Sequence, residues 1–405
     1  MEISNSSIHP SSFKNILTLR YDPSIESNLP SKNWNDFSQS NESINADFIE
    51  KSILNAISKK LENFSENISI ALSGGVDSTL VLSLIRKIKP EIEIDAISIK
   101  FAKSVDETPN AAKIAETFEA NHHIISLDNY LSELPKAISI IKAPFWDLHW
   151  YYVVKKSQTL SKILVSGDGG DELFGGYTFR YEKFLSLTSE NSTPLDKVKA
   201  YLECHERDRV PDQEKIFTTK SNFSWNEIYR LLMPYFDNKL SRLEQVFLAD
   251  YNGKLLYNFN PINSRIVDYF KIEMLAPIIN TELLTLAPSI SKTLKYDEKN
   301  NIGKLLLRKI LKNNNAESLV TDQKLGFNVN TINLWNSHGQ KLCQYFLEKP
   351  RIVEDGWINQ EWINDYIKKS DLDIKYVNKF LGLLSFEIWY RLFITKELSS
   401  DDTLD

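Results

Sequence analysis

The sequence predicts an α/β protein with a doubly wound parallel sheet and a mainly helical C-terminal region. Three observations lead to this fold class. Short apolar runs alternate with helical periodicity between residues 47 and 167, two glycine-rich loops follow predicted strands, and helical periodicity with many aromatic residues fills residues 195 to 395. We therefore expect an N-terminal arm or stub over 1–45, an α/β domain over 46–190 and a mainly helical region over 191–405.

The chain up to residue 64 contains one strand-like stretch and one clear helix. Residues 1–45 are polar and rich in Ser and Asn, apart from the strand-like NILTLRY at 15–21. Apolar residues recur every four positions over 47–64, which predicts a helix, and Asp47 and Glu50 have capping-box spacing at its start. The apolar positions of that helix are Ile49, Ile53, Ile57 and Leu61.

Four short apolar runs then predict the strands of the sheet. They cover residues 68–72, 94–99, 122–127 and 162–167. The segments between them predict helices, at 79–88, from Thr108-Pro109 onward, and within the aromatic stretch 145–160. Strands and helices in alternation imply a parallel sheet, whose ligands lie beyond the carboxyl ends of the strands.

Composition argues against several classes of partner. The chain has 48 basic and 54 acidic residues, a net charge of −6, which disfavours a nucleic-acid or anionic-membrane surface. The longest uncharged run, 325–340, is rich in Asn, so no membrane span is predicted, and the N-terminus has no pattern of a secretory signal. Cys204 and Cys343 form no C-x-x-C motif, which fits two buried thiols in a reducing cytoplasm.

The first glycine-rich loop, SGGVDST at 73–79, has the features of an anion site. Ser73, Gly74 and Gly75 allow backbone amides to approach an oxyanion, and the helix that follows directs its positive end to the same place. The loop is not a Walker A motif. Asp77 inside a phosphate loop is sensible only if a cation such as Mg²⁺ lies between the carboxylate and the phosphate.

The second loop, LVSGDGGDELFGGY at 164–177, combines five glycines with three acidic residues. Asp168, Asp171 and Glu172 follow a strand of the same predicted sheet, so one or two of them could complete a Mg²⁺ site shared with Asp77. Without a ligand, either loop would be an ordinary strand-to-helix turn. Their residue order at two ends of one sheet favours the ligand-binding interpretation.

The histidines are interpreted as structural. His122 and His123 are neighbours on a predicted strand, so their rings are expected on opposite faces of the sheet, a poor arrangement for one metal ion. His149 is expected at most to lie near the edge of the sheet.

SGGVDS resembles the pyrophosphate loop (PP-loop) of the ATP-pyrophosphatase superfamily, and its pairing with SGDGGDELFGGY resembles the synthetase domain of the asparagine synthetase family. The resemblance extends from about residue 47 to 390. It includes weaker matches at Asp106-Glu107, Pro144, Asp147, Lys304, Leu307-Arg308 and the KLGF segment at 324–327. The family also contains β-lactam and carbapenam synthetases and the cyclases that form the macrolactam of lasso peptides.

The resemblance implies an adenine-nucleotide α-hydrolase-like fold over 46–190, with the helical region completing the substrate site. It implies an AMP-forming carbon–nitrogen ligase, in which a carboxylate attacks the α-phosphorus of ATP and an amine or ammonia then attacks the acyl-AMP. The residues that it assigns to ATP are Ser73, Gly74, Gly75, Asp77, Ser78, Ser98 and Gly167. Asp77 and Asp171 would bind Mg²⁺, and Lys324 would stabilise the charge that develops during transfer.

Asp168 and Glu273 are the remaining catalytic candidates. Asp168 occupies a position where asparagine synthetases usually have Glu and β-lactam-forming relatives have Tyr, and a carboxylate there could hydrogen-bond or deprotonate incoming ammonia. Glu273 occupies the position of the partner glutamate of the cyclising relatives. The resemblance therefore favours ammonia as the nitrogen donor and leaves bulkier amines open as an alternative.

The sequence departs from the family pattern on the side of the acyl substrate. In the family segment E-x-R-x-P-[FL]-L-D, Leu275 replaces the arginine and Asn280 replaces the final aspartate. Asn330 replaces a proline and Asp322 an arginine around KLGF. A missing guanidinium removes a bidentate partner for a carboxylate, so free aspartate as the substrate is in doubt.

Only 72 residues precede the first loop, and no cysteine precedes Cys204, so glutamine hydrolysis by the family's N-terminal cysteine is not expected. The expected partners are a small-molecule or peptidyl carboxylate and an amine or ammonia donor, with a separate glutaminase or pathway protein as a further possibility. Two alternatives stay open. One is a peptide macrolactam cyclase with a wide aromatic cleft near Glu273, and the other is a non-catalytic domain that binds nucleotide and a partner protein. Relatives that thiolate tRNA or make NAD or GMP lack the second loop.

Overall fold

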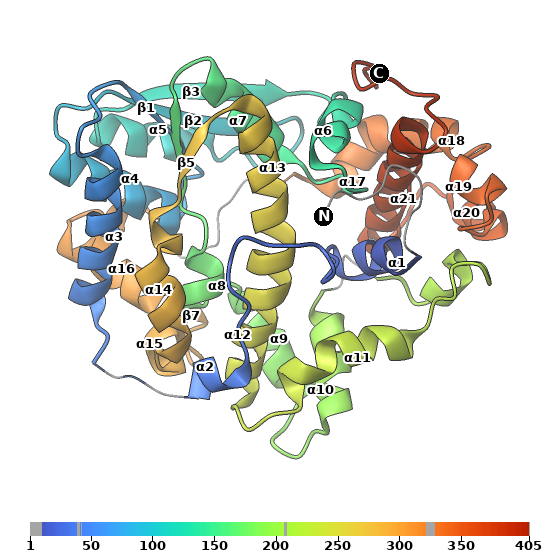
Figure 1. The fold of residues 1–405 in the computed structure, drawn as a ribbon, viewed down its shortest axis with the longest axis horizontal. Helices are drawn as coiled ribbons and strands as arrows, with labels where there is room; N and C mark the ends of the chain where they lie inside the picture. The colour runs from blue at the N-terminus through green and yellow to red at the C-terminus, as the bar shows by residue number, and fades with distance from the viewer. Residues whose placement is uncertain (1–9, 39–40, 42, 206–208, 321–328, 405) are drawn as a thin grey trace.

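A five-stranded parallel sheet forms the centre of the α/β part of the molecule in the computed structural model, which describes residues 10–38, 41, 43–205, 209–320 and 329–404 (Figure 1). The strand order is β3-β2-β1-β4-β5. The strands are β1 (Ile68–Ala71), β2 (Ile94–Phe101), β3 (Asn121–Leu127), β4 (Ile163–Val165) and β5 (Glu273–Leu275). The four strands expected from the sequence and their parallel arrangement are confirmed.

The order of the strands creates a topological switch point between β1 and β4. The chain adds β2 and β3 on one side of β1, and then returns to place β4 and β5 on the other side. Segments that follow β1 and β4 therefore leave the same edge of the sheet side by side. In doubly wound sheets, ligands bind at this position.

Helices cover both faces of the sheet, which explains why the strands β1, β2 and β4 are buried over almost their whole length. On one face, α3 (Ala46–Leu61), α4 (Val76–Ile88) and α5 (Thr108–Thr117) pack on side chains such as Ile70 and Ile94. On the other face, α6 (Leu134–Ile141) and α7 (His149–Gln158) pack on side chains such as Ile97 and Leu164. The long helix α13 (Asn260–Phe270) lies against α6 and α7 and passes through the middle of the view in Figure 1.

Local signals at the helix starts were partly misread. The prediction that α5 begins at Thr108-Pro109 is confirmed. The capping box expected from Asp47 and Glu50 is wrong, because Asn45 is the N-cap of α3 and its side chain accepts a hydrogen bond from the amide of Phe48. Helix α4 begins at Val76, three residues before the start expected at 79, so it includes Asp77 and Ser78 of the first loop.

The rest of the chain is mainly helical, as expected. Its α-helices before α13 are α8 (Gly170–Phe174), α9 (Thr178–Leu187), α10 (Pro194–Cys204), α11 (Trp225–Phe236) and α12 (Arg242–Asp250), and a π-helical stretch, η2 (Tyr251–Phe259), joins α12 to α13. After α13 come α14 (Thr281–Leu286), α15 (Lys292–Lys295), α16 (Leu305–Asn313), α17 (Thr331–Leu334), α18 (Gln340–Phe346), α19 (Arg351–Glu354), α20 (Gln360–Tyr366) and α21 (Ile374–Phe393), with the two-residue strands β6 (Tyr296–Asp297) and β7 (Ile302–Gly303) before α16. Short 3₁₀ turns are η1 (Gln213–Ile216), η3 (Pro277–Ile279), η4 (Ala287–Ser289) and η5 (Glu317–Leu319), and a second π-helical turn is η6 (Trp335–Gly339).

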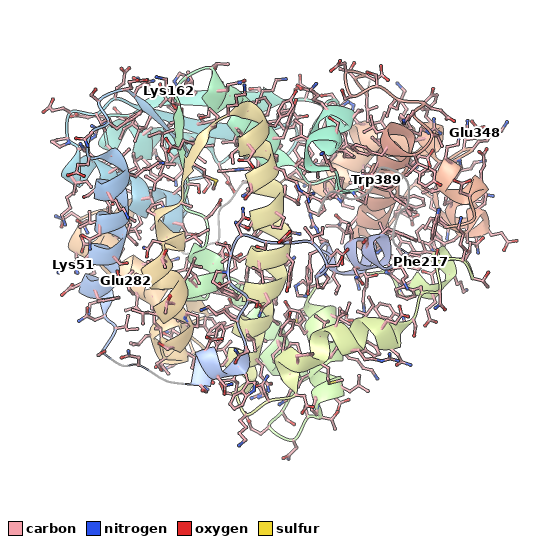
Figure 2. The ribbon with its side chains drawn as sticks, in the orientation of Figure 1. Lys51, Lys162, Phe217, Glu282, Glu348 and Trp389 are labelled. Atoms are coloured by element: carbon pink, nitrogen blue, oxygen red, sulfur yellow. The ribbon has the colours of Figure 1, made fainter. Side chains whose placement is uncertain are left out.

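Aromatic side chains of this region mostly form core, and charged side chains project outward. Phe217 and Trp389 are buried, whereas Lys51, Glu282 and Glu348 extend from the rim of the molecule (Figure 2). Of the helices that the structure describes, none combines the length and the apolar character needed to cross a bilayer.

The N-terminal residues do not form the expected strand. Residues 10 to 19 form helix α1 (Pro10–Leu19), because Phe13, Ile16 and Leu17 make one apolar face at helical spacing. The ring of Phe13 stacks on Phe386 of α21, with 4.7 Å between the ring centroids. Leu17 and Leu19 of the strand-like stretch 15–21 therefore belong to helix α1, and Tyr21 follows its end. A second short helix, α2 (Trp34–Ser38), follows.

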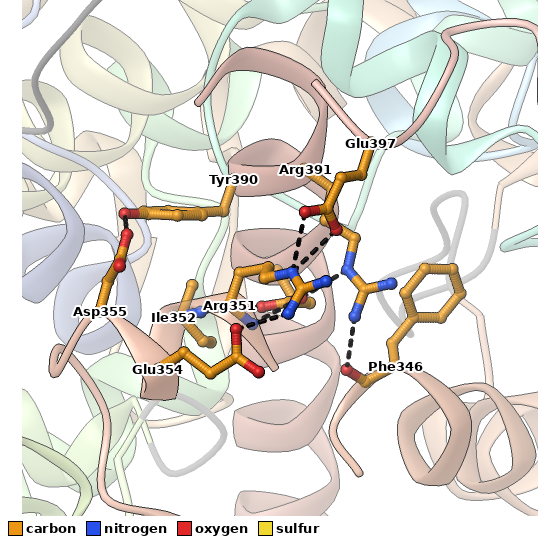
Figure 3. A network of polar contacts seen from close by, with 9 residues as sticks. Phe346, Arg351, Ile352, Glu354, Asp355, Tyr390, Arg391 and Glu397 are labelled. Atoms are coloured by element: carbon orange, nitrogen blue, oxygen red, sulfur yellow. Dashed lines mark hydrogen bonds and ion pairs between the residues drawn. The ribbon is translucent and has the colours of Figure 1, made fainter. Parts of the chain in front are cut away.

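A network of ion pairs holds the C-terminal segment in place (Figure 3). Nε of Arg351 in α19 lies 2.8 Å from Oε2 of Glu397, and Nε of Arg391 lies 2.6 Å from Oε1 of Glu387, both in or after α21. Further along, the amide of Leu404 donates to the carbonyl of Ser132 at 2.8 Å. The C-terminal segment therefore rests on the α/β part of the molecule.

The cysteines and the paired histidines behave as expected. Cys204 and Cys343 are free and buried. The ring of His122 contacts the hydroxyl of Ser98 at 2.9 Å, and that of His123 contacts the carboxylate of Asp95 at 2.7 Å. Ser98 and Asp95 are three positions apart on β2, so the two rings lie on opposite faces of the sheet.

One lysine lies fully inside the apolar core. Lys295 in α15 is only 1% exposed, and its Nζ lies 5.3 Å from the ring centroid of Phe247 and 5.7 Å from that of Phe37. Burial lowers the pKa of Lys295 to about 7, although Glu244 acts in the opposite direction. The folded protein thus resists protonation of a side chain that the unfolded chain protonates readily.

We predict that Lys295→Met stabilises the protein at pH 6 to 7 and that the gain shrinks as the pH rises to 9. The folded pKa of about 7 lies below the unfolded value of about 10.4, so the unfolded chain binds more protons between these values. Stability should therefore rise with pH across this window, by up to about 1.4 kcal/mol per pH unit. Urea unfolding of both proteins across the window measures this, with Lys292→Met as the control on the same helix. A stability difference that is constant with pH would contradict the prediction.

Candidate active site

Both glycine-rich loops open into one cavity at the carboxyl edge of the sheet. Its volume is about 880 Å³, and its wall contains residues 73, 75–78 and 166–172. Because β1 and β4 are neighbours, the loops after them meet at the switch point. The convergence of Asp77 and Asp171 that the sequence predicted is observed.

The first loop presents backbone amides to this cavity. Gly75 is the N-cap of α4 and makes no side-chain capping bond, so the first turn of a 13-residue helix directs its positive end at the cavity. The hydroxyls of Ser73 and Ser78 lie 3.3 Å apart at the same place. Gly74 has a φ of +76°, a backbone conformation that favours glycine, and a Cβ there would also press on Nδ2 of Asn110 at 2.9 Å.

The glycines of the second loop allow its backbone to close around Asp77. A Cβ on Gly170 would lie 2.3 Å from Cγ of Asp77, and a Cβ on Gly167 would lie 2.8 Å from its Cβ. Either contact is too short for a real side chain. The glycine content of the loop is therefore a packing requirement of the Asp77 carboxylate.

Lys304 joins the two carboxylates. Its Nζ lies 2.5 Å from Oδ2 of Asp77 and 2.8 Å from Oδ1 of Asp171. Burial alone would lower the pKa of Lys304, but Asp171 and Asp77 raise it well above its usual value, so this ammonium is charged. Two acids from distant loops and one cation thus occupy a single point of the cavity.

Backbone geometry fixes Lys304 in this position. The residue is the N-cap of α16 and has a left-handed φ of 60°, which is uncommon outside glycine. Its amide donates to the carbonyl of Phe174 at 3.1 Å, and a Cβ on the preceding Gly303 would lie 2.1 Å from the carbonyl oxygen of Gly175. The sequence analysis noted Lys304 but gave it no role, since only the fold brings β7 against the second loop.

The donor set fits a hard divalent cation. Mg²⁺ in phosphate sites is typically bound by one or two carboxylates together with phosphate oxygens and water, and Asp77 and Asp171 supply two carboxylates beside an anion-binding loop. Within the described part of the chain, no group of three or more His, Cys, Asp and Glu side chains is arranged for a metal. The site therefore suits a cation that arrives with a phosphate better than a protein-enclosed metal.

Asp168 and Glu172 differ in their surroundings. Oδ2 of Asp168 accepts a hydrogen bond from Nδ2 of Asn263 at 3.3 Å, and burial raises the pKa of Asp168. Glu172 is buried beneath the loop and accepts a hydrogen bond from the hydroxyl of Tyr177. Asp168 is thus available to a ligand in the cavity, whereas Glu172 supports the loop.

Three other predicted site residues are not found with Asp77, Asp171 and Lys304. Ser98 is 2% exposed and donates its hydroxyl to the carbonyl of Leu72 at 2.6 Å. Glu273 pairs with Ile163 at the amino end of β4, so it lies at the opposite edge of the sheet, where its carboxylate forms an ion pair with Lys60. Lys324 lies outside the described residues, as does Asp322, and its role stays a prediction.

The segment that departs from the family pattern supports the second loop. Glu273–Leu275 forms the edge strand β5, which the sequence analysis missed because it has only three residues. Ile279 packs beneath Gly169, where a Cβ would lie 2.6 Å from its Cγ1. Asn280 is the N-cap of α14 and accepts a hydrogen bond from the amide of Leu283.

A second wall of the cavity contains Arg20, which was not predicted, Asp147, which was one of the weaker family matches, and His149, which was expected at most near the edge of the sheet. Arg20 follows α1, and its Nη2 donates to Oδ2 of Asp147 at 2.7 Å. Nδ1 of His149 lies 3.6 Å from the other carboxylate oxygen. All three side chains line the cavity together with Asp168. No local motif points to Arg20, since only the docking of α1 on α21 brings it there.

Comparison with known proteins agrees with this architecture. The family model described as asparagine synthase matches residues 49–391. The chain belongs to the asparagine synthase family. A curated relative, the glutamine-hydrolyzing asparagine synthetase 1 of Bacillus subtilis, is 24% identical over 370 residues, which cover 82% of this chain and 57% of that protein. A putative asparagine synthetase of Methanocaldococcus jannaschii is 33% identical over 111 residues, 26% of this chain and 22% of that protein. The chain thus matches little more than half of the first relative's length.

Two solved structures share part of the fold at low similarity. The NMN synthetase from Francisella tularensis is 17% identical with a TM-score of 0.27, over 52% of this chain and 96% of that one. The NH₃-dependent NAD synthetase from Campylobacter jejuni is 15% identical with a TM-score of 0.26, over 49% and 99% respectively. These scores are too low to add to the assignment of this asparagine synthase family site.

We predict that Gly170→Ala destabilises the protein through its contact with Asp77. The new methyl group would lie 2.3 Å from the Asp77 carboxylate, and overpacking of this kind costs about 1–3 kcal/mol. The same substitution in an Asp77→Ala background should cost much less, because the colliding atoms are gone. Urea unfolding of the four proteins in this cycle measures the coupling. Equal destabilisation in both backgrounds would refute the packing role of Gly170.

Proposed function

We propose that this chain is an ATP-dependent amide-bond-forming ligase that adenylates a carboxylate and transfers the acyl group to ammonia or an amine. The observation that carries the proposal is the meeting of Asp77, Asp171 and Lys304 beside the first loop. Family membership supports an ATP-dependent amidating ligase in general. The substrates and the AMP-forming step are part of the proposal.

In the first half-reaction, the first loop binds the β- and γ-phosphates of ATP. The amides from Gly75 onward and the hydroxyls of Ser73 and Ser78 supply hydrogen bonds to the phosphate oxygens, and the start of α4 adds positive potential. Asp77 and Asp171 would hold Mg²⁺, which neutralises the triphosphate when bound. The fixed ammonium of Lys304 counters the two carboxylates, so they converge without mutual repulsion.

In the second half-reaction, the amine attacks the acyl carbon and AMP leaves. Asp168 opens to the cavity near both loops and can accept a hydrogen bond from the incoming nitrogen. Lys324 is proposed to stabilise the negative charge that grows on the phosphate and on the tetrahedral intermediate. A role for Glu273 is not supported by its position at the other edge of the sheet.

The cavity favours a small acid over a peptide. Its volume of about 880 Å³ falls within the usual range of small-ligand sites, about 300–1,000 Å³, and the nucleotide takes part of it. We propose a small-molecule carboxylate with free ammonia, a separate glutaminase or a pathway protein as the nitrogen source. Neither nucleic acid nor membrane is proposed as a partner, and a cytoplasmic location remains our expectation.

Each alternative has less support. The macrolactam cyclase was expected to have an aromatic cleft near Glu273, but Glu273 is exposed and paired with Lys60. Most aromatic side chains of 223–259 are at least half-buried, and Phe236, Phe247 and Tyr251 are core residues. A non-catalytic nucleotide-binding domain would not need Lys304 held in a left-handed conformation between two acids.

We predict acid-dependent exchange of pyrophosphate into ATP, and its loss in Asp77→Asn. Removing one of two converging carboxylates should reduce exchange on the order of a hundredfold or more, because the triphosphate loses a preorganised charge partner. The measurement is radiolabelled pyrophosphate–ATP exchange across a panel of amino acids and small dicarboxylic acids. Asp237→Asn, on an exposed helix end, is the matched control.

Two outcomes decide between the functions. Exchange that survives Asp77→Asn would overturn the assignment of this carboxylate. ATP binding without exchange for any acid in the panel would favour the non-catalytic alternative.

A further inference from the structure

Three charged or titratable side chains, those of Arg20, Asp147 and His149, form a row in the wall of the cavity. Nη2 of Arg20 lies 2.7 Å from Oδ2 of Asp147, and Oδ1 of Asp147 lies 3.6 Å from Nδ1 of His149. The hydroxyl of Tyr130 also donates to Oδ1 of Asp147, at 3.0 Å. Asp147 is therefore a fixed carboxylate between a guanidinium and an imidazole.

Arg20 is held rigidly at its end of the row. Its backbone has a left-handed φ of 64°, and its carbonyl accepts a hydrogen bond from Nδ2 of Asn258 at 2.6 Å. Its guanidinium carbon lies 5.1 Å from the ring centroid of Phe145 and 5.8 Å from that of Trp146. Burial would raise the pKa of Asp147, but the neighbouring His149 ring and the Arg20 guanidinium hold it well below its usual range.

His149 lies at the other end of the row and lines the cavity. It is the first residue of α7, the helix that leads into β4, so it lies at the carboxyl edge of the sheet with the two loops. His149 and Asp168 both line the cavity, and Asp147 lies between the His149 ring and the Arg20 guanidinium.

We propose that His149 accepts the proton of the attacking amine in the amide-forming step, with Asp147 as its positioning residue and Arg20 fixing Asp147. The proposal rests on the proposed ligase function. A carboxylate beside Nδ1 orients an imidazole and stabilises the imidazolium that forms when the other nitrogen takes a proton.

The step balances with the substrates already named. A bond forms between the amine nitrogen and the acyl carbon, and the bond from that carbon to the phosphate oxygen of AMP breaks, its electron pair leaving with AMP. The proton lost by the nitrogen passes to Nε2 of His149 and then to solvent. Asp168 accepts a hydrogen bond that orients the amine, and Asn263 keeps its carboxylate in place.

His149→Gln separates this role from nucleotide binding. Pyrophosphate exchange reports the first half-reaction, and amide formation from ammonia with the same acid reports the second. We expect exchange within about threefold of the unaltered chain, while amide formation falls by about 10²- to 10⁴-fold. Added imidazole should partly restore amide formation in His149→Ala. Asp147→Asn should reduce amide formation in the same direction by a smaller factor.

The matched control is His123→Gln, which alters another Asp–His pair on the edge strand β3, away from the cavity. It should change neither reaction. Unchanged amide formation in His149→Gln would overturn the role of His149, and so would an equal loss of exchange and amide formation in both His149→Gln and His149→Asn. In either case, exchange by the unaltered chain would still support the ligase function. Absence of exchange in the unaltered chain with every acid would overturn both.

Discussion

The structure depends on holding two like charges together at the end of a sheet. Asp77 and Asp171 come from loops far apart in sequence, and their mutual repulsion would separate them without a cation between them. Lys304 supplies that cation, at 2.5 and 2.8 Å, and the glycines at 167 and 170 leave the space in which the first carboxylate lies. The strand order brings the loops together, but the charge balance and the missing Cβ atoms make the contact possible.

The sheet and the meeting of the two loops could largely be predicted from the sequence, because both depend on local residue patterns. Continuous apolar runs such as 68–72 and 94–99 gave strands with both faces buried, and alternation with helices gave a parallel sheet. The rule that ligands lie beyond the carboxyl ends of parallel strands then placed Asp77 near Asp171. The chemistry of the two loops led to the same prediction, because a carboxylate in a phosphate-binding loop needs a cation that acids of the second loop could help to bind.

What the sequence did not predict depends on contacts between distant segments. Lys304 acquires its role only because Gly303 lies against Gly175, and Arg20 only because α1 packs on α21. Glu273 was misplaced for a related reason. Motif matching aligned its residue type, but the register of β5 against β4 puts it at the amino end of the strand. A three-residue edge strand has too little periodicity to be recognised in the sequence. The end of the sheet at which Glu273 lies could therefore not be predicted.

The docking of α1 has a consequence for biosynthesis. Phe13 stacks on Phe386, so helix α1 gains this stacking partner only after the ribosome has made the much later helix α21. Arg20 also contacts Asn258 and Phe145, which are made before α21. The cavity wall that carries Arg20 is therefore completed only after the sheet and both glycine-rich loops have been synthesised.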